Sequence, residues 1–143
     1  MGKTIKVPQK PVISKSSLLD IAISILTQKQ AREILVFDIR PLSQLFDYAV
    51  VSSGLSSTQI DVIRRALERG LRSEGLRPLG VEGKAESGWI LLDYNDFVIH
   101  VFTPEKREYY RLDLLWGDCP VEEIGEDFKP GEIEKIIMKR NKA

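Results

Sequence analysis

His100, the single histidine of the chain, is the first residue to consider for chemistry, because an imidazole can act as a general base near neutral pH. Asp93, seven residues earlier, could orient it. A general base also needs a nucleophile, and the candidates for that role are weak. Cys119 falls in an expected loop, and Ser52 and Ser53 lack the Gly-x-Ser-x-Gly elbow that exposes a catalytic serine. We therefore predict no catalytic residue and no enzyme activity.

Phosphate chemistry is the second candidate, because the segment VVSSGLSST leads from an expected strand into an expected helix. A helix N-terminus of this kind can bind a phosphate, and the segment is similar to the opening of nucleotidyltransferase domains. Those enzymes also need two neighbouring carboxylates to hold Mg²⁺, whereas here Gly54 is followed only by Asp61 within a helix. We favour simple capping of the helix, and we predict no metal or cofactor. A nucleotide-handling enzyme that uses Asp47 or Asp61 for a metal stays the alternative.

The composition of the chain limits the classes of function further. Its 143 residues include 21 Lys and Arg and 21 Asp and Glu. No general positive charge therefore attracts it to nucleic acid or an anionic membrane, and we expect no direct sequence-specific nucleic-acid binding. Cys119 is the only cysteine, so it cannot close a disulfide within the chain. The start carries no apolar signal segment, and no apolar run reaches membrane-spanning length. We expect a cytoplasmic protein that does not enter a membrane.

Hydrophobic periodicity predicts alternating helices and strands in a single domain. Residues 1–15, with two prolines among lysines, are expected to be a flexible leader. The first helix carries Ser17 three residues before Asp20, which is typical of a capping box. The predicted elements are helices over 16–30, 56–75 and from Pro104, and strands over 32–40, 45–54, 89–94 and 97–103.

This order predicts an α/β fold in which helices flank a mixed β-sheet, with one helix crossing over between strands. The domain is expected to cover residues 16–120. The remaining segment, 121–143, changes from acidic to basic around Pro130 and is expected to be a charged tail that is partly helical or disordered.

The strands 89–94 and 97–103 are expected to form a hairpin around a two-residue turn at Asn95 and Asp96. This register pairs Leu91 with His100 and Trp89 with Phe102. One face of the hairpin is then almost wholly apolar and suits the core: Ile90, Leu92, Tyr94, Phe97, Ile99 and Val101. The other face mixes aromatic, apolar and polar groups: Trp89, Leu91, Asp93, Val98, His100 and Phe102.

The mixed face allows two interpretations. Aromatic anchors with a few polar groups are typical of the centre of a protein interface, which favours a surface that binds a partner. Alternatively, the helix after Pro104 folds back over this face. Its Tyr109, Leu112 and Trp116 fall on one side, and Trp89, His100 and Phe102 would then be core residues.

The runs FDYAVVSSGLSSTQIDVI, GWILLDYNDFVIHVF and YYRLDLLW together resemble the Iojap family, the ribosomal silencing factors, over residues 16–117. The resemblance implies a nucleotidyltransferase-like α/β domain without transferase activity. It also implies binding to the large ribosomal subunit through its fourteenth protein, which blocks joining with the small subunit and lowers translation when nutrients are short. Organellar members act in ribosome assembly instead, and that role is a further alternative.

This resemblance agrees with the interface interpretation, because a neutral chain that binds a basic ribosomal protein needs aromatic and acidic groups. An exposed region with two tryptophans would also suit a homodimer. The residues predicted to bind the partner are Trp89, Leu91, Asp93, Asp96, Val98, His100, Phe102, Tyr109 and Asp113.

Overall fold

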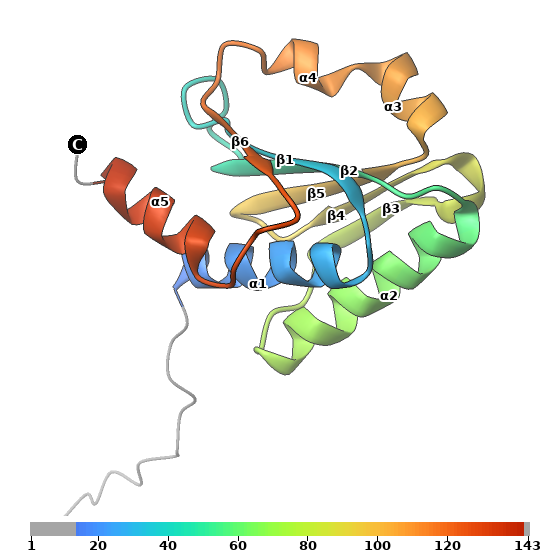
Figure 1. Ribbon diagram of the computed structural model, residues 1–143, viewed down its shortest axis with the longest axis horizontal. Helices are drawn as coiled ribbons and strands as arrows, with labels where there is room; N and C mark the ends of the chain where they lie inside the picture. The colour runs from blue at the N-terminus through green and yellow to red at the C-terminus, as the bar shows by residue number, and fades with distance from the viewer. Residues whose placement is uncertain (1–13, 142–143) are drawn as a thin grey trace, which may run out of the picture.

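The structure is a computed structural model that describes residues 14–141. It confirms a single α/β domain in which helices lie on both faces of one mixed sheet (Figure 1). The six strands are β1 (Arg32–Asp38), β2 (Tyr48–Ser53), β3 (Gly80–Lys84), β4 (Trp89–Asp93), β5 (Phe97–Phe102) and β6 (Val121–Ile124). The helices are α1 (Lys15–Gln28), α2 (Ser57–Ser73), α3 (Pro104–Tyr110), α4 (Leu112–Leu115) and α5 (Glu132–Asn141), with a short 3₁₀ turn at Ala85–Ser87.

The sheet has the strand order β3-β4-β5-β2-β1-β6. The β2 and β5 strands are parallel, and every other neighbouring pair is antiparallel. A parallel pair needs a crossover connection, which the chain makes through α2. In Figure 1, α1, α2 and α5 cover one face of the sheet, and α3 and α4 cover the other.

The predicted hairpin is confirmed in its register. Trp89 pairs with Phe102, and Leu91 pairs with His100. Asn95 adopts a left-handed φ of 73° in the turn, and its N–H donates a 2.8 Å hydrogen bond to Oδ1 of Asp93. The face predicted to be core lies in the main hydrophobic core under α1 and α2: Ile90, Leu92, Tyr94, Phe97, Ile99 and Val101.

The β3 strand was not among the predicted elements, because its sequence GVEGK is rich in glycine. It pairs with β4 at the edge of the sheet. Gly83 has a φ of +84°, and a Cβ added to it would lie 2.2 Å from the carbonyl oxygen of Trp89. Glycine is uncommon inside strands, yet here it lets the backbone of β3 approach β4 closely.

The expected helix after Pro104 is two short helices. Its start is as predicted, because Thr103 caps α3 by accepting a hydrogen bond from the N–H of Lys106. Arg111 then adopts a left-handed conformation with a φ of 51° and separates α3 from α4. The prediction that Tyr109, Leu112 and Trp116 share one side was wrong for Tyr109. This break rotates α4 relative to α3, so Tyr109 is exposed while Leu112 and Trp116 pack on the sheet.

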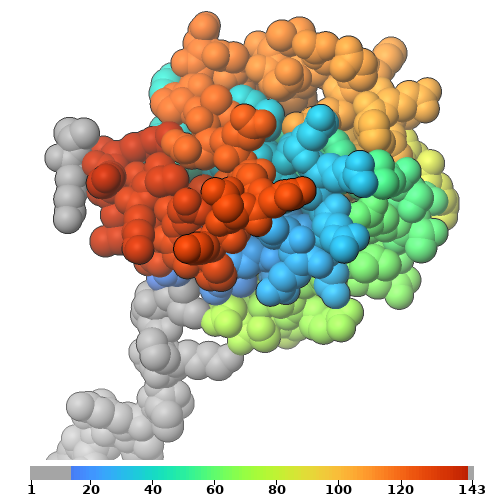
Figure 2. Space-filling view, viewed as in Figure 1, coloured from blue at the N-terminus to red at the C-terminus, as the bar shows by residue number. Residues whose placement is uncertain are grey.

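The segment after residue 120 continues the domain that we expected to end there. The β6 strand pairs with β1, and α5 packs on α1 through the buried residues Ile133 and Ile137. Residues after 120 form a continuous part of the surface in Figure 2, coloured orange-red to red. The sheet edge at β1 and an apolar stripe on α5 explain why this charged segment folds.

Asp20 holds the beginning of α5. Its buried carboxylate accepts hydrogen bonds from the backbone N–H groups of Gly131, Ile133 and Glu134, at 2.7, 2.9 and 3.2 Å. The prediction that Ser17 and Asp20 form a capping box for the first helix was therefore wrong. Ser14 is the N-cap of α1, and its hydroxyl accepts from the N–H of Ser17 at 3.2 Å.

The expected flexible leader, residues 1–15, falls almost entirely outside the described residues. Within residues 14–141, no helix has the length and apolar character needed to cross a membrane.

Candidate partner-binding surface

The second face of the hairpin lies over a smaller hydrophobic core. Val98 and Phe102 on β5 pack there with side chains from β1 and β2. Leu112 and Trp116, at the two ends of α4, pack against the same cluster. Exposed fractions of 3% for Val98, 6% for His100 and 1% for Phe102 place these three beneath the surface. The interpretation in which the chain's own helix covers this face therefore holds for β5.

The β4 strand lies at the border of this cover. Trp89, Leu91 and Asp93 alternate along it on the same face and are all half-buried. We call these three residues the β4 row. The next strand, β3, is the edge of the sheet. On this face of the hairpin, the β4 row is therefore less covered than the buried side chains of β5.

Trp89 is fixed by contacts on several sides. Its ring stacks on Phe102 with centroids 5.0 Å apart and contacts Tyr110 at 4.4 Å. Its Nε1–H donates a 3.1 Å hydrogen bond to Nδ1 of His100, whose ring in turn lies 5.9 Å from that of Trp116. We call these five residues the aromatic cluster. It joins β4 and β5 to α3 and the end of α4.

The environment of His100 favours a neutral imidazole. Burial lowers its pKa from the ordinary value of 6.5 to about 4, because few water molecules remain to solvate a charged ring. Its Nδ1 accepts from the indole, so the proton of the neutral ring resides on Nε2. A buried imidazole with Nδ1 already bonded is arranged to orient Trp89 within the cluster.

The outer side of α3 and α4 exposes an apolar rim. Tyr109 is 76% exposed, Leu114 68%, Leu115 64% and Tyr110 44%. We call these four residues the helix rim. Sequence reasoning named Tyr109 but missed the other three. The adjacent pair Leu114-Leu115 could have signalled the rim. A surface helix normally carries polar residues on the face that does not pack, so two exposed leucines there are unusual.

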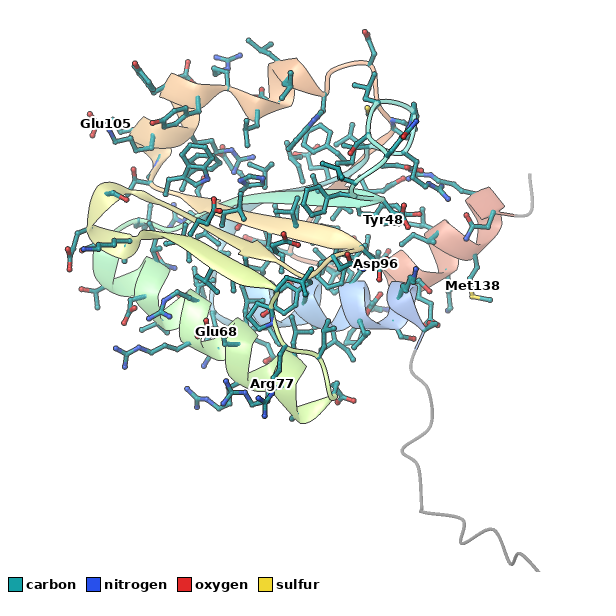
Figure 3. All side chains as sticks on the ribbon, turned by 180° about the vertical axis from the view of Figure 1, so that it is seen from behind. Tyr48, Glu68, Arg77, Asp96, Glu105 and Met138 are labelled. Atoms are coloured by element: carbon teal, nitrogen blue, oxygen red, sulfur yellow. The ribbon has the colours of Figure 1, made fainter. Side chains whose placement is uncertain are left out.

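The three acidic residues of the prediction lie at different places. Asp93 ends the β4 row. Asp96, which is labelled in Figure 3, lies in the hairpin turn, and its Oδ1 is 2.9 Å from Nζ of Lys15. This carboxylate raises the pKa of the Lys15 ammonium above its usual value. Asp113 lies on α4 beside the helix rim, with Oδ1 3.6 Å from Nε of Arg111. The structure thus places Asp113 beside the helix rim, Asp93 at the far end of the β4 row from Trp89, and Asp96 in the hairpin turn.

The residues that a nucleotide-handling enzyme would use for phosphate and metal make other contacts in this structure. Ser56 caps α2 by accepting from the N–H of Gln59 at 3.1 Å, which agrees with the helix capping favoured for the segment VVSSGLSST. The Ser52 hydroxyl donates to the backbone carbonyl of His100 at 3.2 Å. Asp61 forms ion pairs with two arginines of its own helix, whereas Asp47 precedes the other end of β2, a strand that spans roughly 20 Å. Residues 14–141 contain no group of three metal-ligating side chains.

Comparisons with known proteins agree with one another. The family described as "Ribosomal silencing factor during starvation" matches residues 12–142. The ribosomal silencing factor of Bacillus subtilis is 34% identical over 112 residues, covering 78% of this chain and 95% of the relative. A mouse protein named for mitochondrial assembly of the ribosomal large subunit is 33% identical over 101 residues, which is 44% of its length. A crystal structure from Chromobacterium violaceum superposes with a TM-score of 0.70 at 27% identity, covering 85% of this chain and 99% of that one.

Proposed function

Because the chain belongs to the family of ribosomal silencing factors, we propose that it represses translation by binding the large ribosomal subunit and preventing it from joining the small one. The resemblance of the sequence names the fourteenth protein of the large subunit as the contact. A ribosomal partner is consistent with the cytoplasmic location expected from the sequence. The observation that carries the proposal is the helix rim beside Trp89.

The helix rim has the properties of a docking surface. Tyr109, Leu114 and Leu115 each expose more than 60% of their surface in the free chain, on two consecutive short helices. Contiguous exposed apolar side chains on a folded domain are typical of protein interaction sites. Aromatic and large apolar side chains also dominate the centres of interfaces.

The aromatic cluster supports this surface from beneath. Tyr110 of the rim contacts Trp89, and Trp89 is held by His100 and Phe102. A ring that is already fixed loses little conformational entropy when a partner covers it, which favours affinity. We therefore keep all nine predicted residues in the proposal, with Val98, His100 and Phe102 acting through the side chains above them.

Charge complementarity supports a basic partner. Asp113 lies next to the rim and is 40% exposed, and Asp93 ends the β4 row at a separate place on the sheet. Neither carboxylate is buried by the chain itself, so separate Lys or Arg side chains of a ribosomal protein could approach them. Peripheral charges of this kind mainly set the rate and orientation of association.

The layered fold supports a steric mechanism. If the rim and β4 row contact the large subunit, the opposite layer of α1, α2 and α5 points away from that contact (Figure 1). A helix is about 10 Å across. This layer and the sheet would therefore project well beyond the helix rim and β4 row and occupy space that the small subunit needs. No chemical step is required.

The test compares two exposed apolar residues on opposite sides of the protein. Leu115→Glu places a charge in the helix rim, and Met138→Glu does the same on α5, where Met138 is 50% exposed (Figure 3). We expect Leu115→Glu to weaken co-sedimentation with purified large subunits about 30-fold, equivalent to about 2 kcal/mol, and to relieve inhibition of subunit joining measured by light scattering. Met138→Glu should behave as the unaltered protein does. Equal binding by both variants would exclude the rim as the contact.

A further inference from the structure

The outward face of α2 carries a line of arginines that the aromatic surface does not use. Arg65, Arg69 and Arg72 are spaced four and three residues apart, so they fall on one stripe of the helix. The buried stripe, which ends at Leu71, lies on the opposite side. All three arginines are exposed, and we call them the arginine ridge. Figure 3 shows nitrogen-tipped side chains reaching outward from α2, with Arg77 just beyond the helix.

Most of the charge on the ridge is not neutralised. Arg64, on the flank of the helix, binds both nearby carboxylates, Asp61 at 3.0 Å and Glu68 at 3.3 Å. Arg65 shares Asp61 at 2.9 Å but is still 66% exposed. Within residues 14–141, neither Arg69 nor Arg72 takes part in an ion pair. In a chain of zero net charge, the ridge is therefore a local positive surface.

The surface around the ridge is hollowed on two sides. A shallow hollow of about 310 Å³ is lined by Arg65, Glu68, Arg69 and Arg72. A second, of about 640 Å³, lies between the first turns of α2 and β3, where Arg65 and Lys84 line it together with Asp61 and Glu86. An extended ligand that lies along the ridge could thus continue toward β3.

We propose that the arginine ridge binds the sugar-phosphate backbone of RNA without reading its sequence. The inference rests on the proposed function, because binding to a ribosomal subunit would place the chain beside RNA. The three arginines cover about 10 Å of helix axis, at intervals of about 6 and 4.5 Å. A nucleic-acid duplex offers about one charge per 1.7 Å of its axis, so several phosphates face the ridge at once. Guanidinium groups also match phosphate oxygens in a bidentate geometry.

The position of the arginine ridge allows it to bind RNA while the helix rim binds a protein. The α2 helix lies on the face of the sheet opposite α3 and α4, so RNA on the ridge does not compete with a protein on the helix rim (Figure 1). The ridge is then a second contact, separate from the contact with the large subunit, and it would set the salt dependence of RNA binding.

The experiment measures binding of the full chain to a labelled 20-base-pair RNA duplex by fluorescence anisotropy between 50 and 200 mM salt. Three phosphate contacts predict an affinity that falls about 40-fold over this range. Arg65→Gln/Arg69→Gln/Arg72→Gln should lower the slope of log affinity against log salt by about 2 to 3. The matched control, Lys129→Gln/Lys135→Gln/Lys139→Gln, removes the same charge from exposed lysines in and just before α5 and should keep the original slope.

Three results would overturn the proposal: no binding of the duplex at 50 mM salt, the same slope in both triple variants, or equal affinity for polyglutamate of matched charge. The last would assign the ridge to an acidic protein. Failure of the proposed function is distinguishable, because Leu115→Glu leaves the ridge intact. If that variant keeps subunit binding while the arginine variant loses the duplex, the ridge binds RNA and the helix rim is not the contact.

Discussion

The indole Nε1–H of Trp89 donates a hydrogen bond to Nδ1 of His100, 3.1 Å away, across the β4–β5 ladder. This bond joins a half-buried side chain of the candidate surface to one that is 6% exposed. It gives the chain's single histidine a defined role as an acceptor, and it fixes the direction in which the indole edge points.

The first prediction concerns this hydrogen bond. Trp89→Phe keeps an aromatic ring on Phe102 but leaves the buried Nδ1 of His100 without its donor, which should destabilise the protein by about 1 to 3 kcal/mol in urea unfolding. The control repeats the substitution in a His100→Leu background, where no acceptor is left unpaired. The same loss in both backgrounds would show that ring packing, and not the hydrogen bond, determines the effect.

The second prediction concerns pH. Burial lowers the pKa of His100 to about 4 in the folded protein, against 6.5 in the unfolded chain, so the unfolded chain binds the proton first as the pH falls. The contribution of the neutral ring is fully present above pH 6.5 and is lost progressively between pH 6.5 and 4. At pH 4.5 this loss should reach about 2 to 3 kcal/mol.

His100→Gln removes the titrating group and keeps an acceptor for the indole. The free energy of unfolding, measured at pH 7 and pH 4.5, should therefore fall less in the variant than in the unaltered chain. Other acidic groups titrate in both proteins and cancel in the difference. A variant with the same pH dependence as the original would disprove the assignment.

The third prediction concerns the attachment of α5. Asp20→Asn replaces one acceptor oxygen by a donor that faces the N–H groups of the helix start, so the cap bonds cannot all form. We expect a loss of about 2 kcal/mol in the free energy of unfolding and faster hydrogen exchange at the amide of Ile133. Asp127→Asn, on an exposed residue, is the control and should change neither. Unaltered protection of Ile133 would contradict the cap.

The hairpin could be predicted from the sequence because two local signals agree there. Asn95 and Asp96 fix the turn length, and the alternation from Ile90 to Val101 fixes which face is core. Capping of α2 by Ser56 and of α3 by Thr103 was predictable for the same reason, since each cap acts within three residues of its own position.

The remaining elements depend on contacts that are remote in sequence. The β3 and β6 strands are short and polar or glycine-rich, and they form because a neighbouring strand offers its free edge. Asp20 looked like part of a local cap, yet its partners lie more than 100 residues away. The left-handed conformation of Arg111 has no signal in its residue type, and it sets the direction of α4 relative to α3.

The same limit applies to the candidate site. Sequence reasoning placed Trp89, Leu91 and Asp93 together on one face of the sheet, and the register confirms that they share it. It could not decide how far α3 and α4 extend over that face, because this depends on the bend at Arg111. The exposed leucines of α4 were missed for the same reason.

The packing of α5 on α1 joins the two ends of the described chain. During synthesis, α1 leaves the exit tunnel first and α5 last, so the nascent protein stays open along one side of its main core until its final helix is free. A polypeptide whose translation stops before residue 131 lacks both α5 and the three N–H groups that Asp20 binds. Such a shortened polypeptide would lack the contacts that stabilise α1 on this side of the core.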